Sequence, residues 1–159
     1  MNETASIVWS TLMQEFSDIG DPAAATRITV RLLMAVLLGG LIGLERERHR
    51  KSAGLRTHML VSLGAALFVL VPLESGIHLD DVSRALQGVV AGIGFLGAGA
   101  ILKQDAGGMV KGLTTAATIW MAAAIGITVG LGREVTATLA TVLALFILIV
   151  LHWFERRSA

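Results

Sequence analysis

Charged and hydroxyl residues gather where the apolar stretches of the sequence begin and end. Glu45 follows Gly43 and Leu44 without a polar spacer, so its carboxylate is expected at the edge of an apolar segment. If the segment ends converge, such groups could form an entrance for an ion or a small ligand. The sequence leaves open a second interpretation, solvated loop charge with structural ion pairs, each worth about 0–1 kcal/mol when exposed. The predicted functional mouth consists of Glu45, Arg56, Thr57, Asp105, Lys111, Thr114 and Thr115.

The geometry of this mouth can also be predicted. We expect Glu45 and Asp105 to face Arg56 and Lys111 across a partly dry opening, with His58 beside them at the beginning of the second apolar stretch. We then expect Glu45→Gln or Arg56→Ala to abolish function without preventing membrane insertion.

Catalytic and metal-binding patterns are missing from the sequence. It has no cysteine, and its four histidines lie on different segments without ligand spacing, so we expect no metal site. No phosphate loop, nucleophilic triad or pair of catalytic carboxylates is found, and we expect neither an enzyme nor a cofactor. No Asp, Glu, Lys or Arg lies in the middle of an apolar stretch, where such a residue marks a proton or substrate path. Thr118 and Thr128 lie at that depth, and such hydroxyls can bond to their own helix backbone.

Glycines recur at a spacing of four, in the pairs Gly39 and Gly43, Gly88 and Gly92, and Gly126 and Gly130. This spacing places two glycines on one helix face, where another backbone can approach closely. We expect these faces to pack within one chain, with dimerisation as the alternative. The third stretch adds Gly94, Gly97 and Gly99, which favours a closely packed helix over a locally unwound one with cation-binding carbonyls. Its formal GxGxxG match is rejected, because it lies inside an apolar segment with no strand before it.

Composition and segment length predict the fold class. Of the 159 residues, 54% are hydrophobic and 16% charged, whereas soluble domains carry about a quarter charged residues. A membrane helix needs about 20 mostly apolar residues, and the pattern lacks the alternation of a β-barrel. We therefore predict an all-α membrane bundle of five transmembrane helices plus a short N-terminal interfacial helix. The expected spans are 28–44, 57–73, 85–102, 112–131 and 135–154.

The distribution of basic residues predicts the orientation, because Lys and Arg are retained on the cytoplasmic side. Four lie on one side, namely Arg27, Arg31, Arg84 and Arg133. The other side carries nine, namely Arg46, Arg48, Arg50, Lys51, Arg56, Lys103, Lys111, Arg156 and Arg157. The N-terminus is expected outside the cytoplasm and the C-terminus inside.

The domain organisation follows from these spans. Residues 1–27 form an outer segment, in which Val8, Leu12 and Phe16 predict an amphipathic helix along the membrane interface; a frayed tail is the alternative. Residues 28–154 form the membrane domain, and residues 155–159 a cytoplasmic tail.

Four motifs occur in order between about residues 30 and 132: GGLIGLERE at 39–47, AGLRTH at 53–58, GIGFLGAG at 92–99 and VKGLTTAATIW at 110–120. Together they resemble the signature of the MgtC/SapB membrane proteins. The resemblance implies a bacterial inner-membrane protein that serves in magnesium limitation, acid or ionic stress and, in pathogens, virulence. Some members continue into a soluble cytoplasmic domain, and since the sequence ends at Ala159 we expect a short form without it. Some family members have Asn at the position of Thr114. A polar contact that this Asn makes in those members is therefore not expected in this chain.

The leading hypothesis is a non-enzymatic protein in the lipid bilayer that modulates a membrane partner, such as an ATPase or a transporter. A homo-oligomer is expected, and no nucleic-acid partner, because the net charge is +1 without a clustered basic face. The alternative is a channel or carrier for an ion or small solute through the glycine-rich third helix. A purely structural subunit is a third hypothesis.

Overall fold

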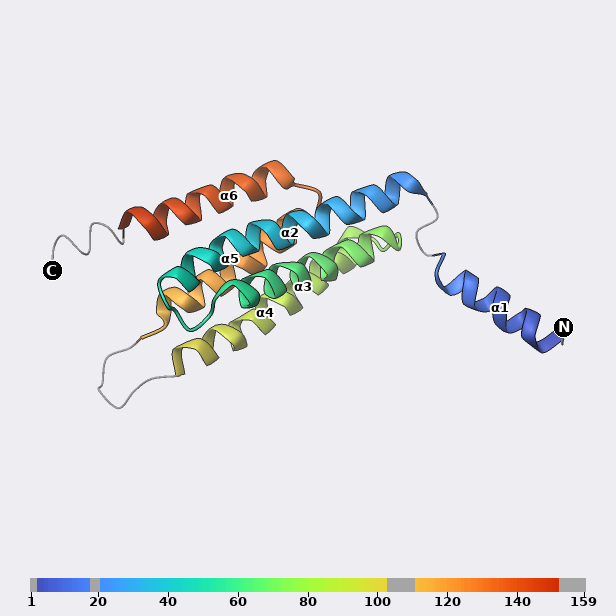
Figure 1. Cartoon of the computed structure of the whole chain (residues 1–159), viewed down its shortest axis with the longest axis horizontal. Helices are drawn as coiled ribbons and strands as arrows, with labels where there is room; N and C mark the ends of the chain where they lie inside the picture. Colours follow the sequence, from blue (N-terminus) through green and yellow to red (C-terminus); the bar gives the residue numbers. More distant parts are fainter. Residues whose placement is uncertain (1–2, 18–20, 103–110, 152–159) are drawn as a thin grey trace. The chain divides into compact units, whose positions relative to one another are not determined.

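A computed structural model describes residues 3–17, 21–102 and 111–151, and all regular structure in these ranges is helical (Figure 1). The all-helical fold is therefore confirmed. The elements are α1 (Glu3–Glu15), α2 (Pro22–Arg48), α3 (Leu55–Glu74), α4 (Leu79–Leu102), α5 (Leu113–Gly130), α6 (Glu134–Phe146) and the π-helical stretch η1 (Ile147–Leu151).

The chain divides into two compact units, residues 1–30 and residues 31–159. In the first unit, α1 has no buried residue, and its apolar side chains Val8, Trp9, Leu12 and Met13 are all exposed. A helix with this much exposed apolar surface suits the interface of a bilayer, where Trp is also favoured. An interfacial position for α1 stays a prediction.

Four described helices are long and apolar enough to cross a membrane. They are Pro22–Arg48, Leu55–Glu74, Asp80–Ile101 and Leu113–Gly130. The fifth expected span corresponds to the shorter apolar helix Glu134–Val150, and the end predicted for it, Phe154, lies outside the described residues.

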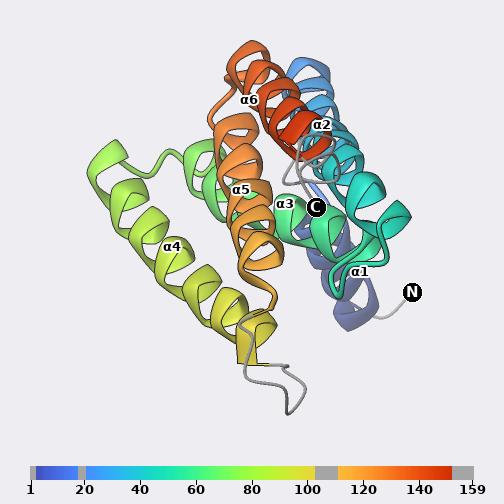
Figure 2. The same ribbon diagram turned by 90° about the vertical axis from the view of Figure 1, so that its left-hand side faces the viewer.

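In the second unit, α5 packs against α3, α4 and α6 (Figure 2). Its buried side chains include Ile125 and Val129, which share a core with Ile42 of α2 and Ala137 of α6. Ile119 and Ala123 of α5 contribute to a second core that includes Ala65 and Ile93, together with Ala53. These small and branched side chains allow the close helix approach that stabilises membrane bundles.

Glycines of both α2 and α5 lie against α3. A Cβ added at Gly39 would lie 2.6 Å from Ser62 Cβ, and one added at Gly43 would lie 2.7 Å from Leu55 Cα. From α5, a Cβ at Gly126 would collide with the main-chain oxygen of Ser62, and one at Gly130 would lie 2.7 Å from Ala66 O. The absence of side chains at these four positions brings α2 and α5 close to α3.

The glycines of α4 lie in a different environment. Nothing in the described part of the chain lies within 4 Å of a Cβ added at Gly88, Gly92, Gly94 or Gly99, whereas one at Gly97 would lie 3.6 Å from Ala116 Cβ. Only 6% of the most apolar window of α4 is buried, against 33–50% in the other three spans. The helix is continuous from Leu79 to Leu102, which rules out the locally unwound alternative.

Arg31, the charge that interrupts the first expected span, joins α2 to the turn between α5 and α6. Its Nη1 donates to Gly130 O at 3.3 Å, and its Nε lies 3.6 Å from Glu134 Oε1. Gly132 in this turn has a positive φ of 74°, which glycine adopts readily. A cation beside the last carbonyls of α5 also interacts favourably with that helix end.

Candidate functional site

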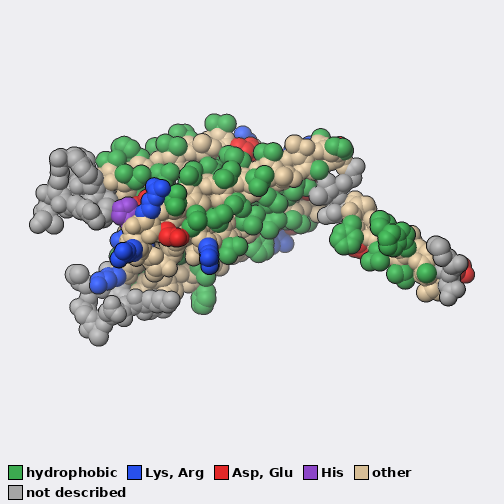
Figure 3. Space-filling model, viewed as in Figure 1, with side chains coloured by type: hydrophobic (Ala, Val, Ile, Leu, Met, Phe, Trp, Pro, Cys, Tyr) green, Lys and Arg blue, Asp and Glu red, His purple; other side chains and the backbone are tan. Residues whose placement is uncertain are grey.

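Polar and charged groups gather where α2 ends and α3 and α5 begin; we call residues 45–58 and 111–118 the charged end. Figure 3 shows Lys and Arg side chains at one end of the bundle and a mainly hydrophobic flank along the helices. The loop after α2 is fixed in place, because Lys51 N donates to Arg46 O at 3.1 Å and Leu55 N donates to Glu47 Oε2 at 2.7 Å. Both bonds hold the cationic loop against α2.

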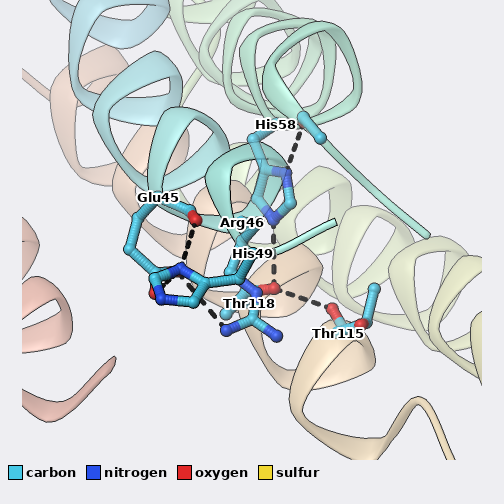
Figure 4. A network of polar contacts seen from close by, with 7 residues as sticks. Glu45, Arg46, His49, His58, Thr115 and Thr118 are labelled. Atoms are coloured by element: carbon cyan, nitrogen blue, oxygen red, sulfur yellow. Dashed lines mark hydrogen bonds and ion pairs between the residues drawn. The ribbon is translucent and has the colours of Figure 1, made fainter. Parts of the chain in front are cut away.

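Glu45 and Arg46 form a buried ion pair at the charged end (Figure 4). Their exposed fractions are 7% and 4%, and Arg46 Nη1 lies 3.4 Å from Glu45 Oε2. His49, one turn further along α2, places its Nδ1 3.0 Å from Glu45 Oε1. A carboxylate withdrawn from water needs such partners, because an unpaired buried charge is very costly.

His58 connects α3 to α5 within the same end. Its ring is fully buried, with Nδ1 2.8 Å from Gly54 O and Nε2 3.0 Å from Thr118 Oγ1. Because a carbonyl can only accept, Nδ1 carries a hydrogen, and Nε2 of a neutral ring accepts from the threonine.

The Thr118 hydroxyl has two competing acceptors for its single hydrogen. Its Oγ1 also lies 2.9 Å from Thr115 O, one turn earlier in α5. With a neutral His58 ring the hydrogen goes to Nε2, and with a charged ring Nε2 donates and the hydrogen goes to Thr115 O. The contact between α3 and α5 is kept in both states, while the direction of the hydrogen bond reverses.

The structure brings together only part of the predicted mouth. Glu45 and Thr115 are buried, whereas Arg56, Thr57 and Thr114 are exposed, and Asp105 lies outside the described residues. Among the residues described, the ion-pair partners of Glu45 are Arg46 and His49, not Arg56. The reason is helical register: Arg46 shares the inward face of α2, while Arg56 occupies the outward face of α3.

Two cavities flank the beginning of α5. One, of about 580 Å³, is lined by Lys111 and Thr115 together with Arg50, Lys51, Ser52, Ala100 and Gly112. The other, of about 320 Å³, is lined by Thr57 and by mainly apolar groups of α3, α4 and α5. Arg56 and Thr114 line neither cavity. The first cavity therefore suits an anion better than a cation, since three of its lining residues are basic.

Sequence reasoning missed Arg46 and the link between His58 and Thr118. Arg46 was counted only as a loop charge, yet it lies four residues after the buried Ile42, and Ile42 lies four after the buried Leu38. Continuing that spacing would have placed Arg46 on the inward face of α2. The pairing of His58 with Thr118 joins residues sixty positions apart, and no sequence pattern signals it.

Within the described ranges, no group of three or more His, Cys, Asp or Glu side chains could hold a metal ion. The groups near Glu45 are an arginine and a histidine, which lie 3.4 and 3.0 Å from its carboxylate oxygens.

Comparison with known proteins identifies the family. Residues 32–157, which include most of the bundle and the charged end, match the model described as the MgtC family. The chain belongs to the MgtC family. Protein SrpB of Synechococcus elongatus is 44% identical over 140 residues, covering 81% of this chain and 75% of that protein.

Two further relatives are longer than the region of similarity. Protein MgtC of Salmonella typhimurium is 46% identical over 128 residues, covering 80% of this chain and 54% of that protein. The Putative magnesium transporter YhiD of Escherichia coli is 42% identical over 130 residues, covering 77% of this chain and 60% of that protein. The chain thus matches little more than half the length of these two relatives. No solved structure matches it.

Proposed function

We propose that this MgtC family protein is a non-enzymatic modulator of a membrane partner, such as an ATPase or a transporter, under magnesium limitation or acid and ionic stress. The observation that carries the proposal is the buried Glu45–Arg46 pair with His49 at the edge of the bundle. A buried ion pair contributes little net stability, because desolvation offsets the Coulomb attraction. A charged cluster at a membrane edge is therefore better explained by recognition of a partner than by stabilisation of the fold.

The interior of the bundle supports modulation over transport. The polar residues buried in α3 and α5 are His58 near the beginning of α3, Ser62, Thr115 and Thr118, and no Asp, Glu, Lys or Arg lies in the middle of these helices. A proton or cation path through one chain normally needs such a residue. The ordered polar groups lie instead at the charged end, where a partner can reach them.

The location of the protein completes the proposal. The excess of Lys and Arg on one side supports a cytoplasmic position for the charged end in a bacterial inner membrane, with the N-terminus outside. The open glycine face of α4 is the surface through which a homo-oligomer would form, because glycine lets helix backbones approach closely.

A growth assay tests the role of the charged end. A strain without its own copy is grown at limiting magnesium while it expresses the wild-type chain, Glu45→Gln or Asp81→Asn. Glu45→Gln removes the charge that Arg46 and His49 compensate, so we expect loss of growth with unchanged protein in the membrane. Asp81→Asn makes the same chemical change at an exposed position and should restore growth. Full growth with Glu45→Gln contradicts the proposal.

Transport is the second candidate function. It is favoured by the printed name of YhiD, a putative magnesium transporter, and by an α4 face that could line the axis of an oligomer. Purified protein in liposomes, loaded with a cation indicator, separates the two functions. Gradient-dependent magnesium flux would favour transport, and its absence at a protein density that gives verified insertion would favour modulation.

A further inference from the structure

We infer that the charged end binds a phosphate group in the cavity between residues 50–52 and the beginning of α5. This cavity measures about 580 Å³. The inference deepens the proposed function by naming a ligand for the same end of the molecule, and it rests on that proposal only for the cytoplasmic placement of the site.

Three basic side chains line this cavity: Arg50, Lys51 and Lys111. No described carboxylate lines it. Glu45 is engaged by Arg46 and His49, and Glu47 accepts the N–H of Leu55. A concave surface whose described charged residues are all basic concentrates counter-ions, so the cavity favours anions.

The first turn of α5 faces the same space. Gly112, the residue before this 18-residue helix, has a φ of 93° and provides no side-chain hydrogen bond to the first turn. The first N–H groups of a helix have no partner within the helix and attract anions. Gly112 and Thr115 both line the cavity. A phosphate there would meet main-chain N–H groups and the basic side chains together.

Arg46 provides an independent indication of a missing acceptor. The residue is only 4% exposed, and its Nε has no hydrogen-bond partner among the residues that the structure describes. In Figure 4 its guanidinium points toward the beginning of α5, where Thr115 lines the cavity. A buried donor without an acceptor is costly, although Arg46 itself is not among the residues that line the cavity.

The ligand chemistry follows from the number and kind of donors. Several cations and a helix N-terminus together match the several oxygens and the charge of a phosphate group. Two sources can supply that group, free inorganic phosphate in the cytoplasm and the headgroup of an anionic phospholipid. The site lies at the membrane edge, so both can reach it.

Binding is measured on the purified chain with both sources. Calorimetric titration of inorganic phosphate in neutral detergent covers the first. Native mass spectrometry of lipids retained from nanodiscs of phosphatidylglycerol and phosphatidylcholine covers the second. We expect saturable binding of phosphate, or selective retention of phosphatidylglycerol. The double variant Lys51→Ala/Lys111→Ala should weaken binding at least about tenfold, because charge-assisted hydrogen bonds contribute about 1.5–3 kcal/mol each.

The control is Arg84→Ala/Arg133→Ala, which removes two exposed positive charges remote from the cavity and should bind as the wild type does. Lys51→Gln, a single change on the exposed loop, serves if the double variant folds poorly. Phosphate binding alone assigns a soluble ligand, and phosphatidylglycerol retention alone assigns a lipid. Binding of neither, or undiminished binding by folded variants, overturns the inference. Because purified protein is used, this outcome is independent of the growth assay above.

Discussion

Thr118 shows how much one hydroxyl contributes at the residue scale. It lies on the inward face of α5 and is the single side-chain contact of His58 Nε2 among the hydrogen bonds of the described chain. Thr128 lies ten residues later on the same helix, and its side-chain hydroxyl donates to Ala124 O within that helix. Both threonine hydroxyls thus bond to a carbonyl of the preceding helical turn, but only Thr118 also contacts a second helix.

Thr118→Val should destabilise the protein by about 1–2 kcal/mol, because it leaves His58 Nε2 buried without a partner. Thr128→Val should change the free energy of unfolding by less than about 0.5 kcal/mol, since only a bond within its own helix is lost. Unfolding of both variants in detergent, followed by circular dichroism, measures the difference. Equal stabilities of the two variants would contradict an inter-helix role for Thr118.

At the scale of the helices, the glycines fall into two groups, those packed against a neighbouring helix and those with an open face. In α2 and α5, glycines lie directly against α3, and Ser62 of α3 is contacted by both Gly39 and Gly126. In α4, no atom of the described residues lies within 4 Å of a Cβ added at the glycines 88, 92, 94 and 99. The same sequence spacing thus serves internal packing in two helices and leaves a third with a bare backbone face.

Gly126→Ala should cost about 1–3 kcal/mol, because the added methyl group collides with the backbone of α3 at Ser62. The matched control is Gly64→Ala on α3, where nothing lies within 4 Å of the added carbon. That change should be neutral or stabilise the helix by about 0.5–1 kcal/mol, through the lower conformational entropy of alanine. Thermal unfolding in detergent compares the two. A neutral Gly126→Ala would show that α5 can move away from α3 without loss.

At the scale of the whole molecule, the distribution of charged and apolar surface determines how the protein can lie in a bilayer. Basic side chains gather at the charged end, and the flanks of the bundle expose large apolar side chains such as Leu60, Phe68 and Phe95. In a bilayer the flanks would face lipid or another helix, and the positive-inside rule predicts a cytoplasmic position for the basic end.

Single cysteines report the orientation directly, because the chain has none of its own. Ser52→Cys, in the loop after α2, should react with a membrane-impermeant maleimide only after spheroplasts are opened. Ser75→Cys, at the opposite end of α3, should react in intact spheroplasts. Both serines are exposed, so accessibility in the folded chain does not bias the comparison. The reverse labelling pattern would invert the proposed topology.

Cross-linking tests the proposed homo-oligomer. Gly92→Cys places a thiol on the bare face of α4, and Leu139→Cys places one on an exposed position of α6. A short bismaleimide should give a dimer band in native membranes with Gly92→Cys and little with Leu139→Cys. The physical reason is that glycine faces permit close backbone approach. Equal bands, or none with Gly92→Cys, would argue against an α4 interface.

The fold could be largely predicted from the sequence, and the site only in part. Long apolar runs specify membrane helices, because a backbone in lipid must satisfy its hydrogen bonds internally. The charge beside the apolar run at Glu45 pointed to the end of the bundle where the structure has a buried ion pair. The last expected span, 135–154, overlaps the described apolar helix Glu134–Val150, and its predicted end lies outside the described residues.

The sequence by itself determined the helices, their order and the family, because these depend on local hydropathy and on short motifs. Only the tertiary structure decided that Glu45 pairs with Arg46 rather than Arg56, and that His58 meets Thr118. It also decided which glycines touch a neighbour and which are bare. These outcomes depend on helical register and on contacts between residues distant in the sequence, and neither is encoded in any single segment.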